Sequence, residues 1–333
     1  MRLIRGLTNL KTLSQSGEGP LARGCVATVG NFDGVHCGHQ AILEQVKTQA
    51  AKHNLPSVVV IFEPQPQEFF RGVDAPPRLT GFRQKVEALR GQGIDAVLCL
   101  RFDEQFRQFS AWGFVDSLLI QGLAVKHLVV GDDFRFGCDR SGDFKFLQKV
   151  GADAGFTVEN TRTVVIEGDR VSSTRIRKLL ADNQLDSAEH LLGWKYHIAG
   201  RIVYGRQLGR EIGAPTANIR LAQIPALRGV YVVKVKLADG TEHDGIANIG
   251  LRPTVDGKHP ALEVHLFDYV GTLYGQRLDV SFRHGLRDEV RFESVGALKA
   301  QIAKDFSSAR RWLAESLAAN RTANRTATQT DLN

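Results

Sequence analysis

The stretch GNFDGVHCGH, residues 30–39, is the most informative part of this sequence. An apolar run at residues 26–29, typical of a β-strand, precedes it, and apolar residues at helical spacing follow it: Ala41, Ile42, Leu43 and Val46. The first turn of a helix has backbone N–H groups without partners and a positive dipole end, so it attracts a polyphosphate. His36 and His39 could add donors to such a ligand, and Asp33 could anchor the turn. The stretch therefore predicts a phosphate site; the alternative is an ordinary strand-to-helix turn whose histidines face water.

Short apolar strands alternate with helices through the first half of the chain. The pattern predicts strands at residues 26–29, 57–62, 96–100 and 127–130, and helices at 40–53, 82–91 and 112–121. Nearly all-apolar strands separated by helices indicate a doubly wound parallel sheet, a Rossmann-like α/β architecture with both faces covered. Ligands of such sheets bind beyond the carboxyl ends of the strands. We therefore expect the turn at 30–39 to share one crevice with FEPQP at 62–66 and GDDFRFG at 131–137.

A further segment with hydroxyl side chains, residues 171–180, begins another helix. Ser172, Ser173 and Thr174 could cap its first turn, which would make it an ordinary basic surface helix. The same hydroxyls, together with the Arg177 guanidinium, could instead donate hydrogen bonds to triphosphate oxygens. Both interpretations use the same capping chemistry, and the sequence leaves them open.

The second half of the chain has a different pattern. Closely spaced β segments at residues 196–204, 229–235, 261–266 and 277–282, with glycine-rich turns, predict an antiparallel barrel. A final helix with apolar residues on one face should pack against this barrel. We place the domains at residues 1–188 and 189–318, and we expect residues 319–333, rich in Asn, Thr and Ala, to form a disordered tail.

The barrel half contains its own candidate phosphate site. Glycine recurs at every fourth position, at Gly205, Gly209 and Gly213, and could let a loop wrap a nucleotide's phosphates. Thr216 and Asn218 offer hard oxygen ligands suited to Mg²⁺. Glycine-rich turns of a barrel are the alternative explanation. The chain has no G-x-x-x-x-G-K-[ST] loop and no protein-kinase signature, so phosphoryl transfer would need a different cradle.

Glu263 lies in an otherwise apolar strand, between Leu262 and Val264. Such a carboxylate is either the solvent-facing residue of an alternating strand or a general base placed beside a hydroxyl substrate. Strand alternation by itself favours the solvent-facing position.

Composition restricts the class of protein. With 333 residues, 43% hydrophobic and 24% charged, the chain is typical of a globular protein of two domains. It has no apolar run of about 20 residues and no signal peptide, which predicts a cytoplasmic protein without a membrane partner. Its four cysteines form no C-x-x-C pair and should be reduced. The net charge of +7 suits anionic ligands, but its basic residues are scattered, so we expect nucleotides rather than nucleic acid.

Several short motifs together resemble the bifunctional riboflavin kinase/FMN adenylyltransferase family, the prokaryotic FAD synthetases. They occur in order along residues 1 to 318: GNFDGVHCGH at 30–39, FEPQP at 62–66, GDDFRFG at 131–137, VSSTRIR at 171–177, GAPTANI at 213–219, GVY at 229–231, NIGLRPT at 248–254 and LEVHLFD at 262–268. Each motif is weak by itself, but the ordered set is highly specific.

The resemblance implies that the N-terminal half transfers an adenylyl group from ATP to FMN, whose phosphate attacks the α-phosphorus directly. His36 and His39 match the family's paired histidines and should stabilise charge on the triphosphate. By the same resemblance, further ATP and flavin contacts fall on these residues: Gly30, Phe32, Asp33, Gly34, Gly38, Phe62 as a flavin wall, Asp133, and Ser172, Ser173, Thr174 and Arg177 of a mobile phosphate-binding motif.

The resemblance also implies that the C-terminal half phosphorylates the ribityl 5′-hydroxyl of riboflavin. Thr216 and Asn218 match the Mg²⁺ and phosphate ligands, with Gly205, Gly209 and Gly213 around the nucleotide, and Glu263 matches the general base. ATP, riboflavin and FMN would be the substrates, and the oligomeric state is open. Two alternatives are an adenylyltransferase whose barrel only senses flavin, and a basic regulator that binds nucleic acid. Intact Thr216, Asn218 and Glu263 argue against the first.

Overall fold

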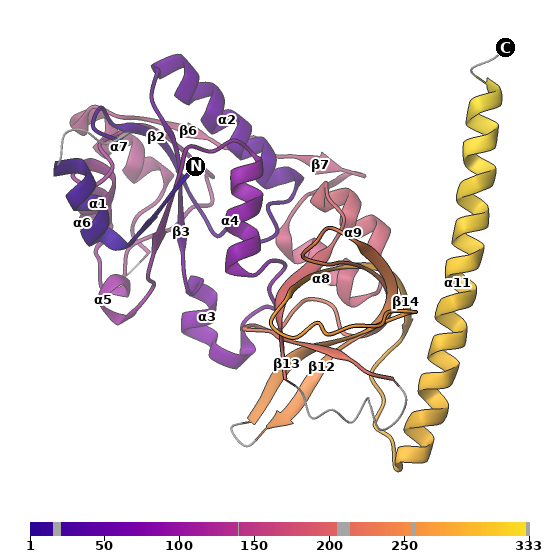
Figure 1. Ribbon diagram of the computed structural model, residues 1–333. Coiled ribbons are helices and arrows are strands. Elements are labelled where there is room, and N and C mark those ends of the chain that lie inside the picture. Colours follow the sequence, from indigo (N-terminus) through magenta and orange to yellow (C-terminus); the bar gives the residue numbers. More distant parts are fainter. Residues whose placement is uncertain (16–20, 139, 205–213, 255–256, 331–333) are drawn as a thin grey trace. The chain divides into compact units, whose positions relative to one another are not determined.

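The computed structural model describes residues 1–15, 21–138, 140–204, 214–254 and 257–330 (Figure 1). The chain forms two compact units. The first, here called the α/β unit, comprises Met1–Ile176 and Leu191–Gly193. The second, the barrel unit, comprises Arg177–His190 and Trp194–Asn333. The predicted fold class, a parallel α/β domain followed by an antiparallel barrel, is confirmed.

A parallel six-stranded sheet is the centre of the α/β unit. Its strand order is β1-β4-β3-β2-β5-β6, and every neighbouring pair is parallel. The strands are β1 (Arg2–Arg5), β2 (Cys25–Val29), β3 (Ser57–Phe62), β4 (Ala96–Leu100), β5 (Val125–Val130) and β6 (Thr157–Asn160). The chain order reverses between β2 and β5, and ligands of such sheets bind beyond the carboxyl ends at this point.

The four apolar strands that the sequence predicts are the four inner strands, whereas the two edge strands are not predicted. β1 and β6 have only four residues each, with the sequences RLIR and TVEN. An edge strand pairs on one side only and is partly exposed, so it needs no continuous apolar run.

Helices cover both faces of this sheet (Figure 1). One face packs against α1 (Gly6–Gln15), α6 (Ala111–Phe114), η2 (Val115–Ile120) and α7 (Phe144–Ala154). The other face packs against α2 (Cys37–His53) and α4 (Phe82–Gly91). The shorter elements of this part of the chain are α3 (Pro66–Arg71), η1 (Gly72–Asp74), α5 (Glu104–Arg107), β7 (Val165–Ile166), β8 (Asp169–Arg170), α8 (Ser173–Ala181) and α9 (Leu185–Leu192).

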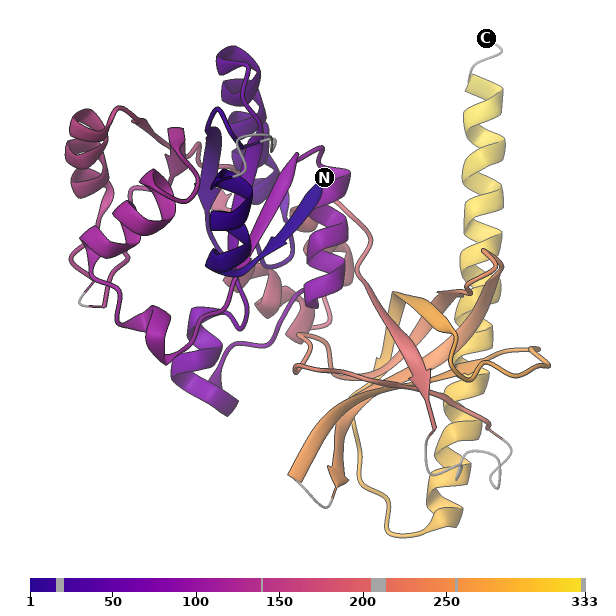
Figure 2. The same ribbon diagram turned by 60° about the vertical axis from the view of Figure 1, so that its left-hand side comes forward.

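The barrel unit is a closed antiparallel barrel of six strands (Figure 2). Its order is β10-β13-β12-β11-β14-β9, from strands β9 (His197–Val203), β10 (Ala217–Arg220), β11 (Gly229–Lys236), β12 (Glu242–Thr254), β13 (Gly257–Leu266) and β14 (Arg277–Arg287). The sequence does not predict β10 or β12. β10 has four residues, and β12 contains glycines and polar residues that interrupt its apolar pattern.

The long helix α11 (Val295–Thr330) packs on the barrel through the apolar face that its sequence predicts (Figure 2, yellow). Phe306, Ala309 and Leu313 meet a cluster that includes Val230, Val232 and Ile246. The structure continues this helix through Thr330, where the sequence analysis expects a disordered tail. Alanine is the strongest helix former, and no Gly or Pro interrupts residues 297–330. No helix in the described ranges is both long and apolar enough to span a bilayer.

The boundary between the units differs from the predicted one at residues 188/189. Arg177–His190 belongs to the barrel unit, and Leu191–Gly193 belongs to the α/β unit. Hydrogen bonds on either side of this boundary accompany the division, one of them between residues 152 positions apart and the other between residues seven positions apart. Gln40 donates to the Leu192 carbonyl at 2.9 Å, whereas the Glu189 carboxylate accepts from the Tyr196 amide at 2.9 Å.

Candidate active sites

The two histidines of the 30–39 stretch lie together at the first turn of α2. His36 is the N-cap residue, and its Nδ1 accepts a hydrogen bond from the His39 amide at 3.3 Å. The imidazole rings are stacked, with centroids 3.7 Å apart and planes 16° apart. The Phe32 ring also lies near His39, with the two ring centroids 5.0 Å apart. Both rings are therefore held beside the positive end of a helix dipole, as a site for anionic phosphate requires.

The glycines of this turn allow close packing of the chain. Gly34 has φ +85°, and a Cβ there would lie 2.8 Å from the Leu79 side chain. A Cβ at Gly38 would lie 3.2 Å from the His36 ring and 3.3 Å from the Val171 carbonyl oxygen. A Cβ at Gly30 would likewise lie 3.1 Å from the Phe32 ring, so all three glycines suit a tightly packed turn, and their assigned contacts with substrate stay a prediction.

Phe32 and Asp33 are buried, each with 2% of its surface exposed, and their assigned contacts with substrate stay a prediction. The Asp33 carboxylate instead accepts hydrogen bonds from the amides of Leu79 and Thr80, each at 3.1 Å. The Thr80 hydroxyl in turn accepts from the Gly34 amide at 3.1 Å. Asp33 thus anchors the histidine turn to residues 79–80, which is the structural part of its predicted role.

A buried cluster of charges lies behind this turn. The Arg78 guanidinium, 4% exposed, bonds the Glu63 carboxylate at 2.6 Å and the Glu68 carboxylate at 2.5 Å. Glu63 follows β3 directly, so Arg78 connects the carboxyl end of β3 with the segment that holds Asp33. Burial raises the pKa of Glu68, but the hydrogen bonds from Arg78 and the Gln65 amide, together with the positive charges of Arg78 and Lys85, leave that pKa below its usual value.

Lys85 of α4 belongs to the same cluster and is completely buried. Burial lowers the pKa of its ammonium, while the negative charges of Asp33, Glu63 and Glu68 act in the opposite direction. Its Nζ has no hydrogen-bond partner among the described residues. The sequence analysis missed this cluster. One signal was available, because Lys85 lies at helical spacing with Phe82 and Leu89 and so on the apolar face of its helix.

The segment before α8 connects the histidine turn with the 131–137 loop. The Ser173 hydroxyl donates to the Asp33 carbonyl at 3.0 Å, and the Ser172 hydroxyl accepts from the Arg175 amide at 3.2 Å as a helix cap. Arg170 pairs with Asp133 at 3.6 Å. Thr174 is exposed. The hydroxyls of Ser172 and Ser173 bond to the backbone, as expected for a capped helix, whereas the exposed Thr174 could still bind phosphate. Both interpretations of this segment therefore remain open.

Arg177 lies in α8, one helical turn beyond Ser173. It belongs to the barrel unit, unlike the histidines. Its assigned contact with triphosphate oxygens therefore stays a prediction.

The predicted flavin wall, Phe62, is 7% exposed and lies beneath other aromatic rings. Phe106 lies 5.2 Å from it and Phe102 lies 5.8 Å from it, between ring centroids. Phe102 in turn contacts Phe70, which is 61% exposed. The role of Phe62 as a flavin wall stays a prediction, and the sequence analysis did not predict the exposed ring of Phe70 near it.

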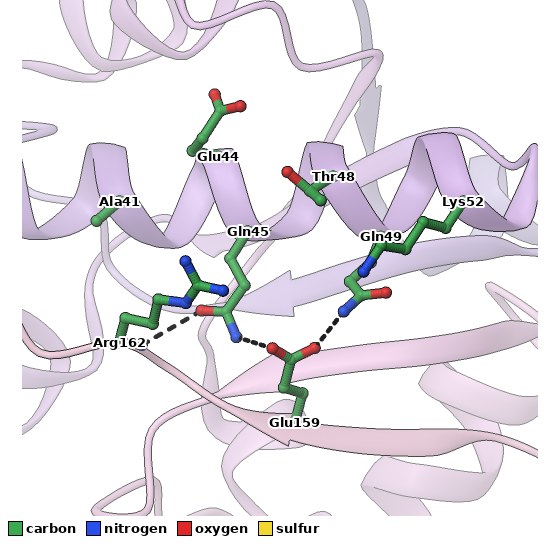
Figure 3. A pocket seen from close by; sticks show the side chains of 8 residues that line it. All are labelled: Ala41, Glu44, Gln45, Thr48, Gln49, Lys52, Glu159 and Arg162. Atoms are coloured by element: carbon green, nitrogen blue, oxygen red, sulfur yellow. Dashed lines mark hydrogen bonds between the residues drawn. The ribbon is translucent and has the colours of Figure 1, made fainter.

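Helix α2 is fixed to the edge strand β6 by a polar network (Figure 3). Gln45 and Gln49 both point toward Glu159 and donate to its carboxylate, at 2.5 and 2.6 Å. His127 of β5 contacts the same carboxylate at 3.0 Å. A cavity of about 230 Å³ lies here, lined by Ala41, Glu44, Gln45, Thr48, Gln49, Lys52, Glu159 and Arg162. The side-chain amides of Gln45 and Gln49 already pair with Glu159. We therefore interpret this network as one that orients α2, and with it the two histidines, rather than as a phosphate site.

The barrel unit brings three polar residues into one row across neighbouring strands. Asn218 of β10 pairs in register with Glu263 of β13, which pairs on its other side with Asn248 of β12. Leu262 and Val264, at most 1% exposed, fill the barrel interior, so Glu263 and both asparagines lie on the outer face. Strand alternation thus places Glu263 on the outer face of the barrel. There it lies between the side chains of Asn218 and Asn248 on the neighbouring strands.

Asn218 is 8% exposed, and its amide nitrogen donates to the Thr216 carbonyl at 3.2 Å. Its Oδ1 has no hydrogen-bond donor among the described residues. A buried amide oxygen without a donor fits a hard cation such as Mg²⁺. Within the described ranges no three His, Cys, Asp or Glu side chains gather as metal ligands, so Mg²⁺ here would rely on Thr216, Asn218 and substrate phosphates. Gly205, Gly209 and Gly213 lie outside the described residues.

Two family models match the chain, in the order of the two units. The model of FAD synthetase matches residues 19–175, and the model of riboflavin kinase matches residues 192–313. A bifunctional riboflavin kinase/FMN adenylyltransferase of Pseudomonas fluorescens is 53% identical over 319 residues, which covers 95% of this chain and 99% of the relative. The enzyme of that name from Escherichia coli strain K12 is 48% identical over 313 residues, 94% of this chain and 98% of the relative.

A solved structure also resembles the whole chain. It is described as a macrolide-efflux protein from Streptococcus pneumoniae, and it matches with a TM-score of 0.73 at 29% sequence identity. The match covers 94% of this chain and all of that one, 100%. The likeness extends over both units.

Proposed function

This chain belongs to the bifunctional riboflavin kinase/FMN adenylyltransferase family, and we propose that the two sites described above carry the two reactions separately. The protein is an enzyme that phosphorylates riboflavin to FMN with ATP, and then transfers an adenylyl group from a second ATP to FMN, which gives FAD and pyrophosphate. The observation that supports the division is that His36 and His39 lie in one compact unit, whereas Asn218 and Glu263 lie in the other.

In the kinase reaction, the 5′-hydroxyl oxygen of riboflavin forms a bond to the γ-phosphorus, and the bond from that phosphorus to ADP breaks. Glu263 takes the hydroxyl proton, because an alcohol is a weak nucleophile at neutral pH. Asn218 and Asn248 flank this carboxylate and limit where it can point. Thr216 and Asn218 would hold Mg²⁺, which when bound neutralises charge on the nucleotide phosphates.

In the adenylyl transfer, a phosphate oxygen of FMN forms a bond to the α-phosphorus of ATP, and the bond to pyrophosphate breaks. His36 and His39 stabilise the negative charge that moves onto the leaving pyrophosphate. Stacking and the N-cap hydrogen bond hold both imidazoles in place before substrate binds. The rings of Phe70 and Phe102 offer an apolar surface for the flavin ring.

Isotope labels would test both reactions in one tube. The purified full chain is incubated with riboflavin, MgCl₂ and ATP labelled at either the γ- or the α-phosphorus. The γ label should enter both FMN and FAD, and the α label should enter FAD but not FMN. FMN without γ label, or FAD without α label, would contradict the proposal. Omitting MgCl₂ in the presence of EDTA should stop both products.

A further inference from the structure

The segment that follows β14 passes very close to two glycines of the barrel. Gly229 has φ +107°, and a Cβ there would lie 2.6 Å from the Arg287 carbonyl oxygen. A Cβ at Gly250 would overlap the carboxylate of Glu289. These glycines belong to the motifs GVY and NIGLRPT, for which the two reactions gave no explanation. Both glycines make room for residues 287–289.

Glu289 reaches the polar row of the kinase site. Its carboxylate accepts hydrogen bonds from the side chain of Asn248 and from the backbone of Leu251. Asn248 lies two residues before Gly250, on the same face of β12, and directly opposite Glu263. The carboxylate of Glu289 therefore packs on Gly250 and bonds to Asn248, which is the strand neighbour of the proposed general base, Glu263.

The segment is firmly attached on its other side. The Arg287 guanidinium binds the Asp305 carboxylate of α11 through Nε and Nη2, at 3.0 and 2.8 Å. Asp305 is 6% exposed. A bidentate pair of this kind fixes geometry as well as contributing energy. The Arg287–Asp305 pair therefore fixes the backbone two residues before Glu289, and this limits where the Glu289 side chain can lie relative to Asn248.

The surroundings of the Glu289 carboxylate affect its charge. Partial burial, and then the nearby negative charge of Glu263, raise the pKa of Glu289, although Arg228 and the two hydrogen bonds oppose this shift. The charged form is therefore less favourable here than in water. The side chain is nonetheless exposed to solvent, and its position is fixed by its packing on Gly250.

We propose that Glu289 is a positioning residue of the kinase site, which orients the Asn248 side chain beside Glu263. The proposal rests on the assigned role of Glu263. Held by Glu289, the Asn248 amide keeps a fixed place at the edge of the space that the ribityl hydroxyl must enter. Loss of this hold should slow the chemical step rather than weaken ATP binding.

Kinetics of three variants would test the proposal in the full chain. Glu289→Ala should lower kcat for FMN formation about tenfold, within the range for coupled neighbours, with KM for ATP within about twofold. Glu289→Gln keeps an acceptor for Asn248 and should recover most of this loss. In an Asn248→Ala background, Glu289→Ala should cause no further decrease, because the residue through which it acts is absent. Glu293→Gln, an exposed carboxylate of the same segment, is the matched control and should change nothing.

FAD synthesis from supplied FMN is measured on every variant and should stay unchanged. An unchanged kcat in Glu289→Ala, an additive loss in the double variant, or an equal fall in both activities would each overturn the proposal. Glu263→Gln is assayed in parallel to separate two failures. If that variant keeps full kinase activity, the assigned role of Glu263 is wrong. If it loses activity while Glu289→Ala does not, only the present inference is wrong.

Discussion

The two sites of this protein are built by different means. In the α/β unit, His36 and His39 lie on a turn at the end of a strand, and a buried charge cluster around Arg78 holds that turn in place. In the barrel unit, Asn218, Glu263 and Asn248 stand in one row because three neighbouring strands pair in register. The first site depends on tertiary contacts of loops, and the second on the backbone ladder itself.

This difference predicts different sensitivities. A turn held by buried ion pairs can lose its geometry when one distant charge is removed, because the remaining charge stays buried without a partner. A row fixed by strand hydrogen bonds should tolerate changes outside the row, but should lose function when a member of the row is changed. The following predictions test this contrast, from the largest effect to the smallest.

The largest effect is expected for Glu263→Ala. Removal of the general base should lower FMN formation by about 10²- to 10⁴-fold, while FAD synthesis from supplied FMN continues. Product chromatography with riboflavin or FMN as the starting flavin measures both. Glu242→Ala, at the exposed start of β12, is the control. Loss of both reactions in a folded variant would show that the sites are not separate.

His39→Ala should produce the converse result. FAD synthesis should fall by about 10²- to 10³-fold, the usual cost of removing one donor that stabilises transition-state charge, and FMN formation should persist. The control is His53→Ala, an exposed histidine at the other end of the same helix. If the rate of FMN formation fell together with the rate of FAD synthesis, the proposal of two separate sites would be contradicted.

Arg78→Met tests the buried cluster. Two partly buried carboxylates, 26% and 17% exposed, would lose their cation, which should cost about 3 kcal/mol of unfolding free energy in the α/β unit, the lower end of the range for breaking a buried pair. Urea unfolding should show this loss, and FAD synthesis should fail at lower urea than FMN formation. Arg83→Met removes an exposed pair with Glu87 and should cost at most about 0.5 kcal/mol. Equal stability of the two variants would show that the cluster does not hold the turn.

Glu68→Gln should lower stability by about 1.5–3 kcal/mol at neutral pH, the range for hydrogen bonds to charged groups. Because the folded-state pKa of Glu68 is lowered, its contribution is complete above the unfolded value of about 4.3 and is lost as the pH falls through the folded value. The difference between wild type and variant, measured by urea unfolding, should therefore shrink as the pH falls below about 4.3. A difference that grows on acidification would contradict the assigned ion pairs.

The smallest expected effect is that of Asn218→Ala on metal dependence. Loss of one oxygen ligand should raise the Mg²⁺ concentration for half-maximal FMN formation about tenfold, as changes around metal ligands commonly do. A titration of MgCl₂ at fixed ATP measures this value. The Mg²⁺ dependence of FAD synthesis should not move. A shift of equal size in both reactions would place the metal role of Asn218 in doubt.

Local patterns predict much of both sites, and long-range contacts explain where those patterns fail. The spacing of His36 and His39 relative to a strand and a helix puts both rings at one helix end, because three residues span about one turn. The burial of the Phe32 ring in the core could not be predicted from its place in a motif, because burial depends on residues distant in the chain. Lys85 and Arg78 were missed, because their carboxylate partners lie 10 or more positions away. Asn248 was missed because strand β12 was not predicted.

The sequence by itself determined the two-domain architecture, since periodicity is a local property, and the resemblance of its ordered motifs to a known family gave the order of the two activities. Only the tertiary structure decided what surrounds those side chains. Asp33 meets Leu79 across 46 positions, and Ser173 meets Asp33 across 140. Packing and strand register bring such residues together, and neither is encoded in any short stretch of the chain. Glu289 lies against Gly250 for the same reason.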